Sequence, residues 1–364
     1  MRFAPPNPLR IADRASGLNA LSVRSYNERL VLSLLLQNQD ISRMTIGEKT
    51  GLSAQTVSVI IRSLEQEGLV SKGEAQRGRV GPPTIPLSLN PEGAYSVGVS
   101  VGYRYIEVVL IDFVGTVRFH AALPIPAAQS IDVYALFLEA IAEAIGHLPP
   151  NFRGRIAGIG LAIPEDLDVW KISGDSDGLD LDRLQRRIDS QLNLPVFVQN
   201  DITAAAGGES MFGVAKPLDD YLYFYLGARL HSRLILNHQI YHGNSNVSFD
   251  VGILNLEGEL SENASPVVDL WSRDVTWPVD SLPFEHWRQR CVEKIRYSVE
   301  ALSQFVDIKT VVLSSYAPIA VCKRICDDLK SEVPGLQAAA GEVNASPKAV
   351  GAASLPFSSR FMVQ

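Results

Sequence analysis

The chain has 364 residues, more than one compact domain usually contains, so we expect two or three domains. Hydrophobic residues make up 46% and charged residues 20%, which excludes a disordered or collagen-like protein. No apolar run reaches the ~18–20 residues that span a bilayer, and the first residues lack the pattern of a secretory signal. Three cysteines are too few for a disulfide scaffold and suit a reducing compartment. The sequence therefore predicts a cytoplasmic protein with no membrane partner.

The formal net charge of −7 is unevenly distributed along the chain. Residues 1–92 contain 11 Lys and Arg and 8 Asp and Glu, a charge of +3, whereas the rest contains 22 and 32, a charge of −10. A basic head on an acidic body predicts two functions, one of which involves phosphates.

The N-terminal region has the pattern of a helix-turn-helix. Residues 1–22 show no hydrophobic period and are predicted to form a flexible arm. Apolar residues at helical spacing predict a helix over 25–37. A second, short helix is expected over 45–52, opened by Thr45, and Ser53 can cap a third helix over 54–67. Helix, short helix, glycine turn and helix together are typical of this DNA-binding motif.

The third helix is apolar on one side and mostly polar on the other. Its apolar stripe consists of Val57, Ile60, Ile61 and Leu64. Gln55, near the end that enters a major groove, could read a base edge, most naturally adenine, and its polar neighbours could hold phosphates. The alternative is a plain helical hairpin with a solvated face. The candidate DNA-contacting residues here are Thr45, Ser53, Gln55, Thr56, Ser58 and Arg62.

A short basic loop follows, between two expected strands. Arg77 and Arg79 flank Gly78, which lets the backbone approach closely, and arginine suits a narrow minor groove. The alternative is a Gly/Pro linker with two solvated arginines. With the helices before it, this loop predicts a wing, and hence a winged helix-turn-helix domain over residues 23–92.

From Tyr95 onward the chain has an α/β pattern. Three strands with turns near 102–104 and 113–115 are expected first, and alternating helices and strands follow, namely helices near 131–147, 181–192, after 201, 284–305 and 319–329, and strands near 155–164, 195–200, 221–226, 234–237 and 310–315. Three hairpin strands followed by alternating helix and strand, twice over, is the plan of the actin-like, ribonuclease H-like ATPase fold. Its two lobes, which close over a cleft, are expected over about 93–198 plus the C-terminal helix and over about 199–345.

Four segments resemble the ROK family, whose name stands for repressor, open reading frame, kinase. These segments are RGRVGPPTIPLSLNPEGAYSVGVSV, GIGLAIP, LPVFVQNDITAAAGGE and QIYHGNSNVSFDVGI. They are similar, in this order, to the family's wing and first strand, its glycine-rich strand, its Asn-Asp loop and the place of its Gly-Glu-Ile-Gly-His signature. Family members with a winged helix-turn-helix are sugar-responsive transcription regulators, and members without it are sugar kinases.

The nucleotide-binding features that the resemblance implies are degenerate. The family's first phosphate loop is Asp-x-Gly-Gly-Thr, whose glycine amides cradle phosphate and whose aspartate works with Mg²⁺, but the matching run is residues 100–104, Ser-Val-Gly-Tyr-Arg. The second, glycine-dense turn is replaced by residues 227–233, Gly-Ala-Arg-Leu-His-Ser-Arg, and the late glycine pair by Ser314 and Ser315. These changes predict that the chain is not an enzyme, has no catalytic residues and does not use ATP.

The sugar-binding side of the resemblance is better preserved. It implies that Asn200 and Asp201 bind sugar hydroxyls, the aspartate being the general base of the kinases. The family's signature glutamate aligns with Asp250, and a further glutamate with Asp269. Converging acceptors of this kind suit a polyhydroxylated ligand. As alternatives, Asn200 and Asp201 could only cap a helix, Asp250 could be a turn residue and Asp269 could be solvated.

The resemblance also raises the question of zinc, which many members bind through the signature histidine and a cysteine cluster. Here Ile253 stands in place of the histidine, and residues 254–290 contain no cysteine. Cys322 and Cys326 are four residues apart on an expected helix, but buried small hydrophobic side chains are the simpler interpretation. We therefore expect no metal site.

Together these features predict a sugar-responsive DNA-binding repressor with a non-catalytic ROK domain. Its expected partners are operator DNA, a sugar or sugar derivative in the cleft, and further copies of itself in a homodimer or homotetramer. Two alternatives remain open at this point. The regulator could respond to a protein partner instead of a small molecule, or the chain could be a sugar kinase with an added head, although it lacks the phosphate loops of a kinase.

Overall fold

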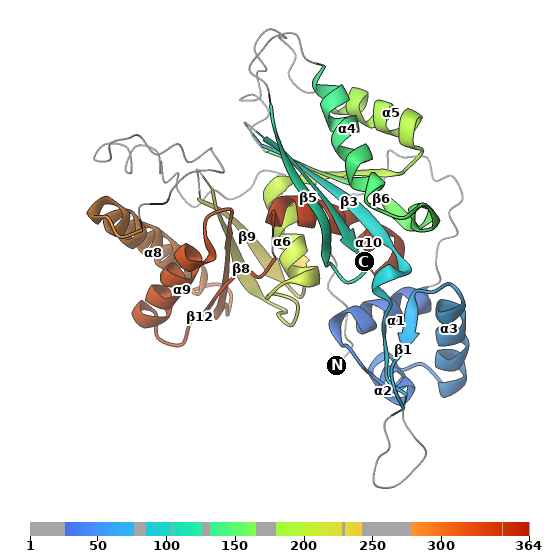
Figure 1. The fold of residues 1–364 in the computed structure, drawn as a ribbon. Helices are drawn as coiled ribbons and strands as arrows, with labels where there is room; N and C mark the ends of the chain where they lie inside the picture. Colours follow the sequence, from blue (N-terminus) through green and yellow to red (C-terminus); the bar gives the residue numbers. More distant parts are fainter. Residues whose placement is uncertain are drawn as a thin grey trace.

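The computed structural model arranges the chain as a small helical head beneath two β-sheets (Figure 1). The structure describes residues 26–75, 85–102, 105–125, 132–164, 180–227, 230–241, 277, 279–343 and 345–363. Within these ranges no helix is both long enough and apolar enough to cross a membrane.

The head contains three helices and a hairpin. Its elements are α1 (Tyr26–Gln37), α2 (Arg43–Thr50), α3 (Ala54–Gln66), β1 (Val70–Lys72) and β2 (Leu87–Leu89), and the two strands pair antiparallel. The second helix begins two residues before the predicted Thr45, because the Ser42 hydroxyl accepts the Thr45 N–H and caps the helix there. Gly51 ends this helix in the left-handed conformation, at a φ of 72°, which favours glycine.

The first sheet has the strand order β5-β4-β3-β6-β7. Its strands are β3 (Tyr95–Val101), β4 (Tyr105–Asp112), β5 (Val117–Pro124), β6 (Ile156–Ile163) and β7 (Val196–Asn200). The first three form an antiparallel meander, and β6 and β7 continue the sheet parallel to β3. The helices α4 (Val133–Gly146) and α5 (Leu181–Leu192) cover one face, and the C-terminal helix α10 (Pro347–Phe361) covers the other. Two short 3-10 turns, η1 (Pro91–Gly93) and η2 (Pro150–Arg155), precede β3 and β6.

The second sheet has the order β10-β9-β8-β11-β12. Its strands are β8 (Tyr221–Leu226), β9 (Leu230–Leu236), β10 (Gln239–Ile240), β11 (Thr310–Ser315) and β12 (Gln337–Ala340). One face packs against α8 (Leu282–Leu302) and α9 (Ile319–Glu332), and the other against α6 (Asp201–Phe212). The strand predicted over 234–237 begins four residues earlier, because its antiparallel pairing with β8 continues to the Leu226–Leu230 pair.

The helices α6 and α10 lie side by side between the two sheets (Figure 1). Their contact needs glycine, since a Cβ on Gly351 would lie well under 3.0 Å from the carbonyl oxygen of Ala204. On the other side of α10, Gly160 of β6 faces the carbonyl oxygen of Ala352, and a Cβ on this glycine would also lie too close to that oxygen. That carbonyl is the one that the N–H of residue 356 would bond in a regular helix, but Pro356 has no N–H.

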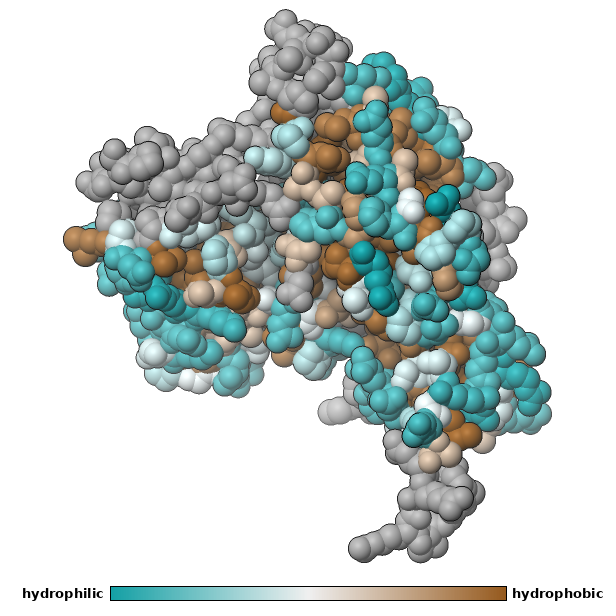
Figure 2. Space-filling model, viewed as in Figure 1, coloured by the Kyte–Doolittle hydropathy of each residue, from teal (hydrophilic) through white to brown (hydrophobic). Residues whose placement is uncertain are grey.

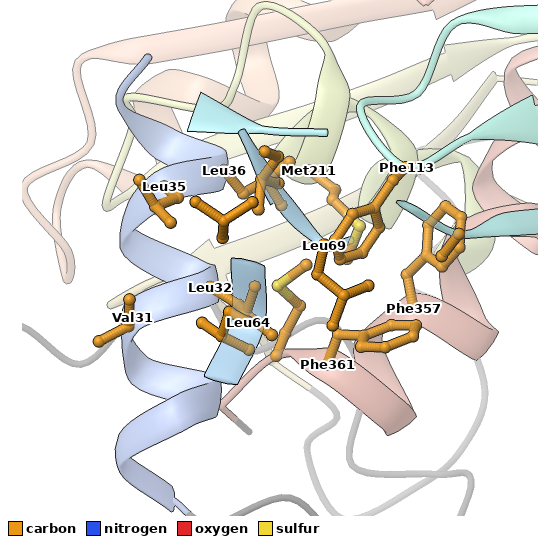
Figure 3. Close-up of a cluster of buried hydrophobic side chains, with 14 of the residues drawn as sticks. Val31, Leu32, Leu35, Leu36, Leu64, Leu69, Phe113, Met211, Phe357 and Phe361 are labelled. Atoms are coloured by element: carbon orange, nitrogen blue, oxygen red, sulfur yellow. The ribbon is translucent and has the colours of Figure 1, made fainter. Parts of the chain in front are cut away.

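The head packs onto the C-terminal end of α10. Buried leucines and Val31 of α1 share a hydrophobic cluster with Phe113, Phe357 and Phe361 (Figure 3). The ring of Phe113 meets those of Phe357 and Phe361 edge to face, at centroid distances of 5.3 and 4.9 Å. Such pairs add about 0.5–1.5 kcal/mol each to the stabilisation from burial. The head is therefore joined to the first sheet by a filled apolar interface.

Candidate functional site

The helix α3 presents a polar surface away from the core of the head. Its apolar stripe is buried as predicted, and it consists of Val57, Ile60, Ile61 and Leu64. Gln55 and Arg62 are exposed on the opposite side, and neither has a hydrogen-bond or ion-pair partner among the described residues. In the space-filling view this side of the head is mostly hydrophilic (Figure 2). Both side chains are therefore available to a ligand such as DNA.

The hydroxyl-bearing candidates of the head have internal partners. The Ser53 hydroxyl accepts the N–H of Thr56 at 3.1 Å and lies 2.8 Å from its hydroxyl, so both belong to the N-cap of α3. The Ser58 hydroxyl donates to the carbonyl of Ala54 at 2.8 Å. Thr45 has a similar place beside Ser42 in α2. Each of these four residues therefore already takes part in an internal hydrogen bond of α2 or α3. A contact from any of them to a DNA phosphate would require an additional hydrogen bond or the exchange of an existing one.

The basic loop predicted to be a wing falls between β1 and β2, which pair as expected. Arg77 and Arg79 themselves lie outside the described residues.

The candidate sugar site lies where β7 ends and α6 begins. Asn200 is the N-cap of α6, and its Oδ1 accepts the N–H groups of Ile202 and Thr203 at 3.0 and 3.1 Å. Its Nδ2 has no partner among the described residues. Asp201 follows as the first residue of the helix and is buried. The amide oxygen of Asn200 thus caps the helix, as the capping alternative expects. The Nδ2 group of Asn200 and the Oδ2 atom of Asp201 take no part in the cap and can bind other groups.

A lysine from the C-terminal helix occupies that second oxygen of Asp201. The Nζ of Lys348 lies 2.5 Å from Asp201 Oδ2 and 4.7 Å from the centre of the Tyr225 ring. The Lys348 side chain is 24% exposed and that of Asp201 is 6% exposed. Lys348 therefore supplies a partly exposed hydrogen-bond donor beside a buried carboxylate.

An arginine from the second sheet holds the other predicted residue. Arg233 of β9 is buried, and it donates from Nη2 to Asn200 Oδ1 at 2.6 Å and from Nε to the hydroxyl of Thr203 at 2.8 Å. Neither Lys348 nor Arg233 was predicted from the sequence. They lie 147 and 33 residues from their partners, and no motif connects the positions.

The other two predicted sugar-binding residues, Asp250 and Asp269, lie outside the described residues. Of the four candidates, the structure thus describes Asn200 and Asp201, and it places the cationic side chains of Lys348 and Arg233 beside them.

The positions that replace the kinase's glycines are occupied by side chains with their own partners. Ser314 donates to the buried Glu209 at 3.1 Å, and Ser315 donates to the carbonyl of Leu226 at 2.6 Å. Of the two earlier loops, Gly102 and Gly227 are described, but 103–104 and 228–229 are not. At the end of β11, the Ser314 hydroxyl is therefore bonded to α6 and the Ser315 hydroxyl to the neighbouring strand β8.

The three cysteines lie in the hydrophobic core of the second lobe. Burial raises the pKa of Cys322 and Cys326 to about 12 and also raises that of Cys291, so all three remain thiols near neutral pH. Across the part of the chain that the structure describes, no group of three or more His, Cys, Asp or Glu side chains could hold a metal ion.

A cavity of about 410 Å³ opens at the border between the head and the second lobe, away from the Asn200–Asp201 pair. Its walls come from α1, from the end of α2, from the connection between α6 and β8 and from the β9–β10 turn. They include Leu30, Leu34, Lys49, Lys216 and His238. The head therefore meets the second lobe across a partly hollow border, in contrast to its filled contact with α10.

Comparison with known proteins agrees with both halves of this architecture. Residues 96–265 match the ROK family model, and residues 24–71 match a model described as winged helix-turn-helix DNA-binding. The xylose repressor of Bacillus subtilis (strain 168) is 30% identical over 241 residues, which cover 65% of this chain and 62% of that protein. The DNA-binding transcriptional dual regulator NagC of Escherichia coli (strain K12) is 24% identical, over 65% of this chain and 58% of that protein. These alignments span about three fifths of the relatives' length.

Solved structures show the same fold. The ROK family transcriptional regulator that is a homologue of the E. coli Mlc protein superimposes with a TM-score of 0.64 at 16% identity, over 92% of this chain and 96% of that one. A ROK family glucokinase from Streptomyces griseus, solved with glucose and AMPPNP, gives a TM-score of 0.55 at 17% identity, over 72% of this chain and 99% of that one. The predicted fold, a winged head followed by an actin-like α/β domain, is confirmed. The chain carries a ROK family domain behind an N-terminal winged helix-turn-helix.

Proposed function

We propose that this chain is a cytoplasmic transcriptional repressor that binds operator DNA through α3 and a sugar or sugar derivative through its ROK domain. The observation that carries the proposal is that one chain combines a helix, α3, whose exposed polar side chains are free to contact DNA, with a polar site built on Asn200 and Asp201. Gln55 and Arg62 have no competing partner among the described residues, so DNA would not have to displace an internal contact. Similarity to proteins named xylose repressor and N-acetylglucosamine repressor supports the same function.

The site chemistry favours a ligand with several hydroxyl groups. Asp201 Oδ2 is an acceptor, whereas Asn200 Nδ2 and the Lys348 ammonium are donors. A hydroxyl both donates and accepts, so a polyol can use this alternation of groups in a way that an apolar ligand cannot. Burial of the carboxylate strengthens each such bond because water competes less well.

We also propose that the ROK domain does not transfer phosphate and holds neither ATP nor zinc. A kinase of this fold needs an aspartate free to accept the proton of a sugar hydroxyl. Here an ammonium already lies 2.5 Å from Asp201 Oδ2, and Ser314 and Ser315 stand at the late glycine pair. Asp201 would then act only as a hydrogen-bond acceptor.

A dimer or tetramer would present two heads to the DNA. Helix-turn-helix dimers bind half-sites about 34–36 Å apart, one turn of the duplex, so the operator is expected to be a near-palindrome with that spacing.

The test of DNA binding starts from a pool of random duplexes selected with the full-length protein. Fluorescence anisotropy on the selected duplex should then show affinity lost in Gln55→Ala and Arg62→Ala. Lys323→Met, which changes an exposed lysine on α9, should bind like the wild type. Failure to enrich any sequence, or equal affinity in all variants, would contradict a DNA-binding role for α3.

The test of effector binding is a thermal-shift screen with xylose, glucose, N-acetylglucosamine and their phosphates, with ATP–Mg²⁺ as a separate arm. A ligand at ~100 times its Kd should add ~2.7 kcal/mol of stability. We expect a sugar response that Asp201→Ala abolishes, and no ATP response. Silence of a folded sample to every sugar would favour control by a protein partner, and an ATP response would point to a kinase.

A further inference from the structure

The helix α10 begins in the candidate sugar site and ends at the DNA-binding head. Its second residue is Lys348, and its C-cap is Met362. Fifteen helical residues span about 22 Å at 1.5 Å per residue. One continuous helix thus connects the two sites to which the proposed function assigns different ligands.

At the sugar-site end, the first turn of α10 is held by polar contacts. Lys348 pairs with Asp201, and the Ser346 hydroxyl that caps the helix donates to Glu107 of β4 at 2.5 Å. A sugar hydroxyl that donates to Asp201 Oδ2 would compete with Lys348 for the same oxygen. Any ligand bound there must therefore change the surroundings of Lys348.

At the other end, the last residues of the chain anchor α1. The Nε of Arg29 donates to the carbonyl of Met362 at 2.5 Å, and the N–H of Val363 donates to the Ser33 hydroxyl at 3.0 Å. Around these bonds lie the rings of Phe357 and Phe361, against the leucines of α1 (Figure 3). A displacement of this end of α10 would therefore change how the head is held.

A displacement at the sugar site can reach the head more directly along α10 than across the border between the head and the second lobe. Between its ends α10 packs against β6 and α6 so closely that Gly160 and Gly351 have no space for a Cβ. Dense interiors transmit a shift because neighbouring groups have no room to absorb it. The border between α1 and the second lobe instead contains the cavity of about 410 Å³, into which side chains can relax.

We propose that α10 communicates occupancy of the Asn200–Asp201 site to the head, and that Lys348 is the residue that senses the occupant. The inference rests on the proposed function only in taking the occupant to be a sugar. Occupancy weakens the Lys348–Asp201 pair, the helix adjusts as a unit, and the anchor between Met362 and Arg29 changes. By linkage, a change at the anchor must alter the sugar site to the same extent.

The experiment measures backbone hydrogen exchange by mass spectrometry in the full-length protein without any sugar. In Lys348→Met the exchange of the α1 amides, residues 26–37, should rise at least threefold. The conservative variant Lys348→Arg should stay near the wild type because it keeps the cation. The matched control Lys323→Met, on the exposed side of α9, should leave α1 unchanged. Protection of β6 reports whether the fold is intact.

Two results would overturn the proposal. One is α1 exchange in Lys348→Met equal to that in Lys323→Met, and the other is an increase in β6 as large as that in α1, which would mean general loosening. If Lys348→Met does not fold, Arg29→Met supplies the reciprocal measurement, because release of the anchor should raise exchange in the first turn of α6. Unchanged exchange there would overturn the proposal as well.

This readout is separate from the test of the proposed function. A positive exchange result together with no response to any sugar would refute the sugar as effector, and it would leave the connection through α10 standing.

Discussion

Substitution of Gly351 by alanine tests the close packing of α10 against α6. The new Cβ would lie well under 3.0 Å from the carbonyl oxygen and carbon of Ala204 and from the amide nitrogen of Ala205. All three are backbone atoms of another helix, so they cannot rotate away as a side chain would. The helices must separate, or α10 must shift against the first sheet, where Gly160 already leaves no space.

The magnitude follows from two opposing terms. Overpacking of a dense interior typically costs about 1–3 kcal/mol, and we take the upper end because the clash is with backbone. Replacement of glycine by alanine within a helix contributes about 1 kcal/mol in the favourable direction. The expected net loss for Gly351→Ala is therefore about 2 kcal/mol in the free energy of unfolding.

Gly146→Ala is the matched control. Gly146 is also helical, as the last residue of α4, but a Cβ there would have nothing within 4 Å. We expect this variant to gain up to ~1 kcal/mol, since only the propensity term applies.

The assay is urea unfolding followed by circular dichroism. With a slope of about 3 kcal/mol per molar urea, Gly351→Ala should lower the midpoint by about 0.7 M, whereas Gly146→Ala should leave it equal or slightly higher. If Gly351→Ala were as stable as Gly146→Ala, the reasoning from close backbone contact would be refuted, and α10 could not be treated as tightly held.

Three further predictions concern single side chains. Arg62→Ala should weaken binding of the selected duplex and reduce the slope of log affinity against log salt by about 1, measured by anisotropy, while the thermal midpoint stays unchanged; an unchanged slope would exclude a phosphate contact. Ser53→Ala should cost about 1 kcal/mol in urea unfolding because α3 loses its N-cap, and Ser53→Thr should recover most of it. Burial raises the pKa of Glu209 above its ordinary 4.5, so the native state binds the proton more tightly than the unfolded chain. Stability should therefore fall as the pH rises from 4.5 through the raised pKa, and Glu209→Gln should lack this slope in urea midpoints between pH 5 and 8; an identical slope in both proteins would contradict this assignment.

The head was predictable from sequence because its structure depends on neighbours in the chain. Ser53 caps α3 through an N–H three residues away, and the stripe from Val57 to Leu64 repeats with the helical period. The hairpin of β1 and β2 follows directly. Even the start of α2 was misplaced by only two residues, because the Ser42 hydroxyl caps the helix ahead of the predicted Thr45.

Elements whose formation depends on distant partners were less well predicted. β12, the segment Gln337–Ala340, has three alanines and no β-branched residue, so its sequence gives no strand signal. It is a strand because it pairs parallel to β11. The extension of β9 toward Leu230 likewise comes from its pairing with β8.

The sequence by itself determined the winged helix-turn-helix head, the order of most of the helices and strands that follow it, and the place of Asn200 and Asp201 at the start of a helix. Only the tertiary structure decided that Lys348, 147 residues away, pairs with Asp201, and that the end of the same helix holds Arg29. Caps and periodicities act over three or four residues and leave a pattern in the chain. Contacts across the two sheets depend on strand order and on how closely glycines let helices approach, and no local pattern records them.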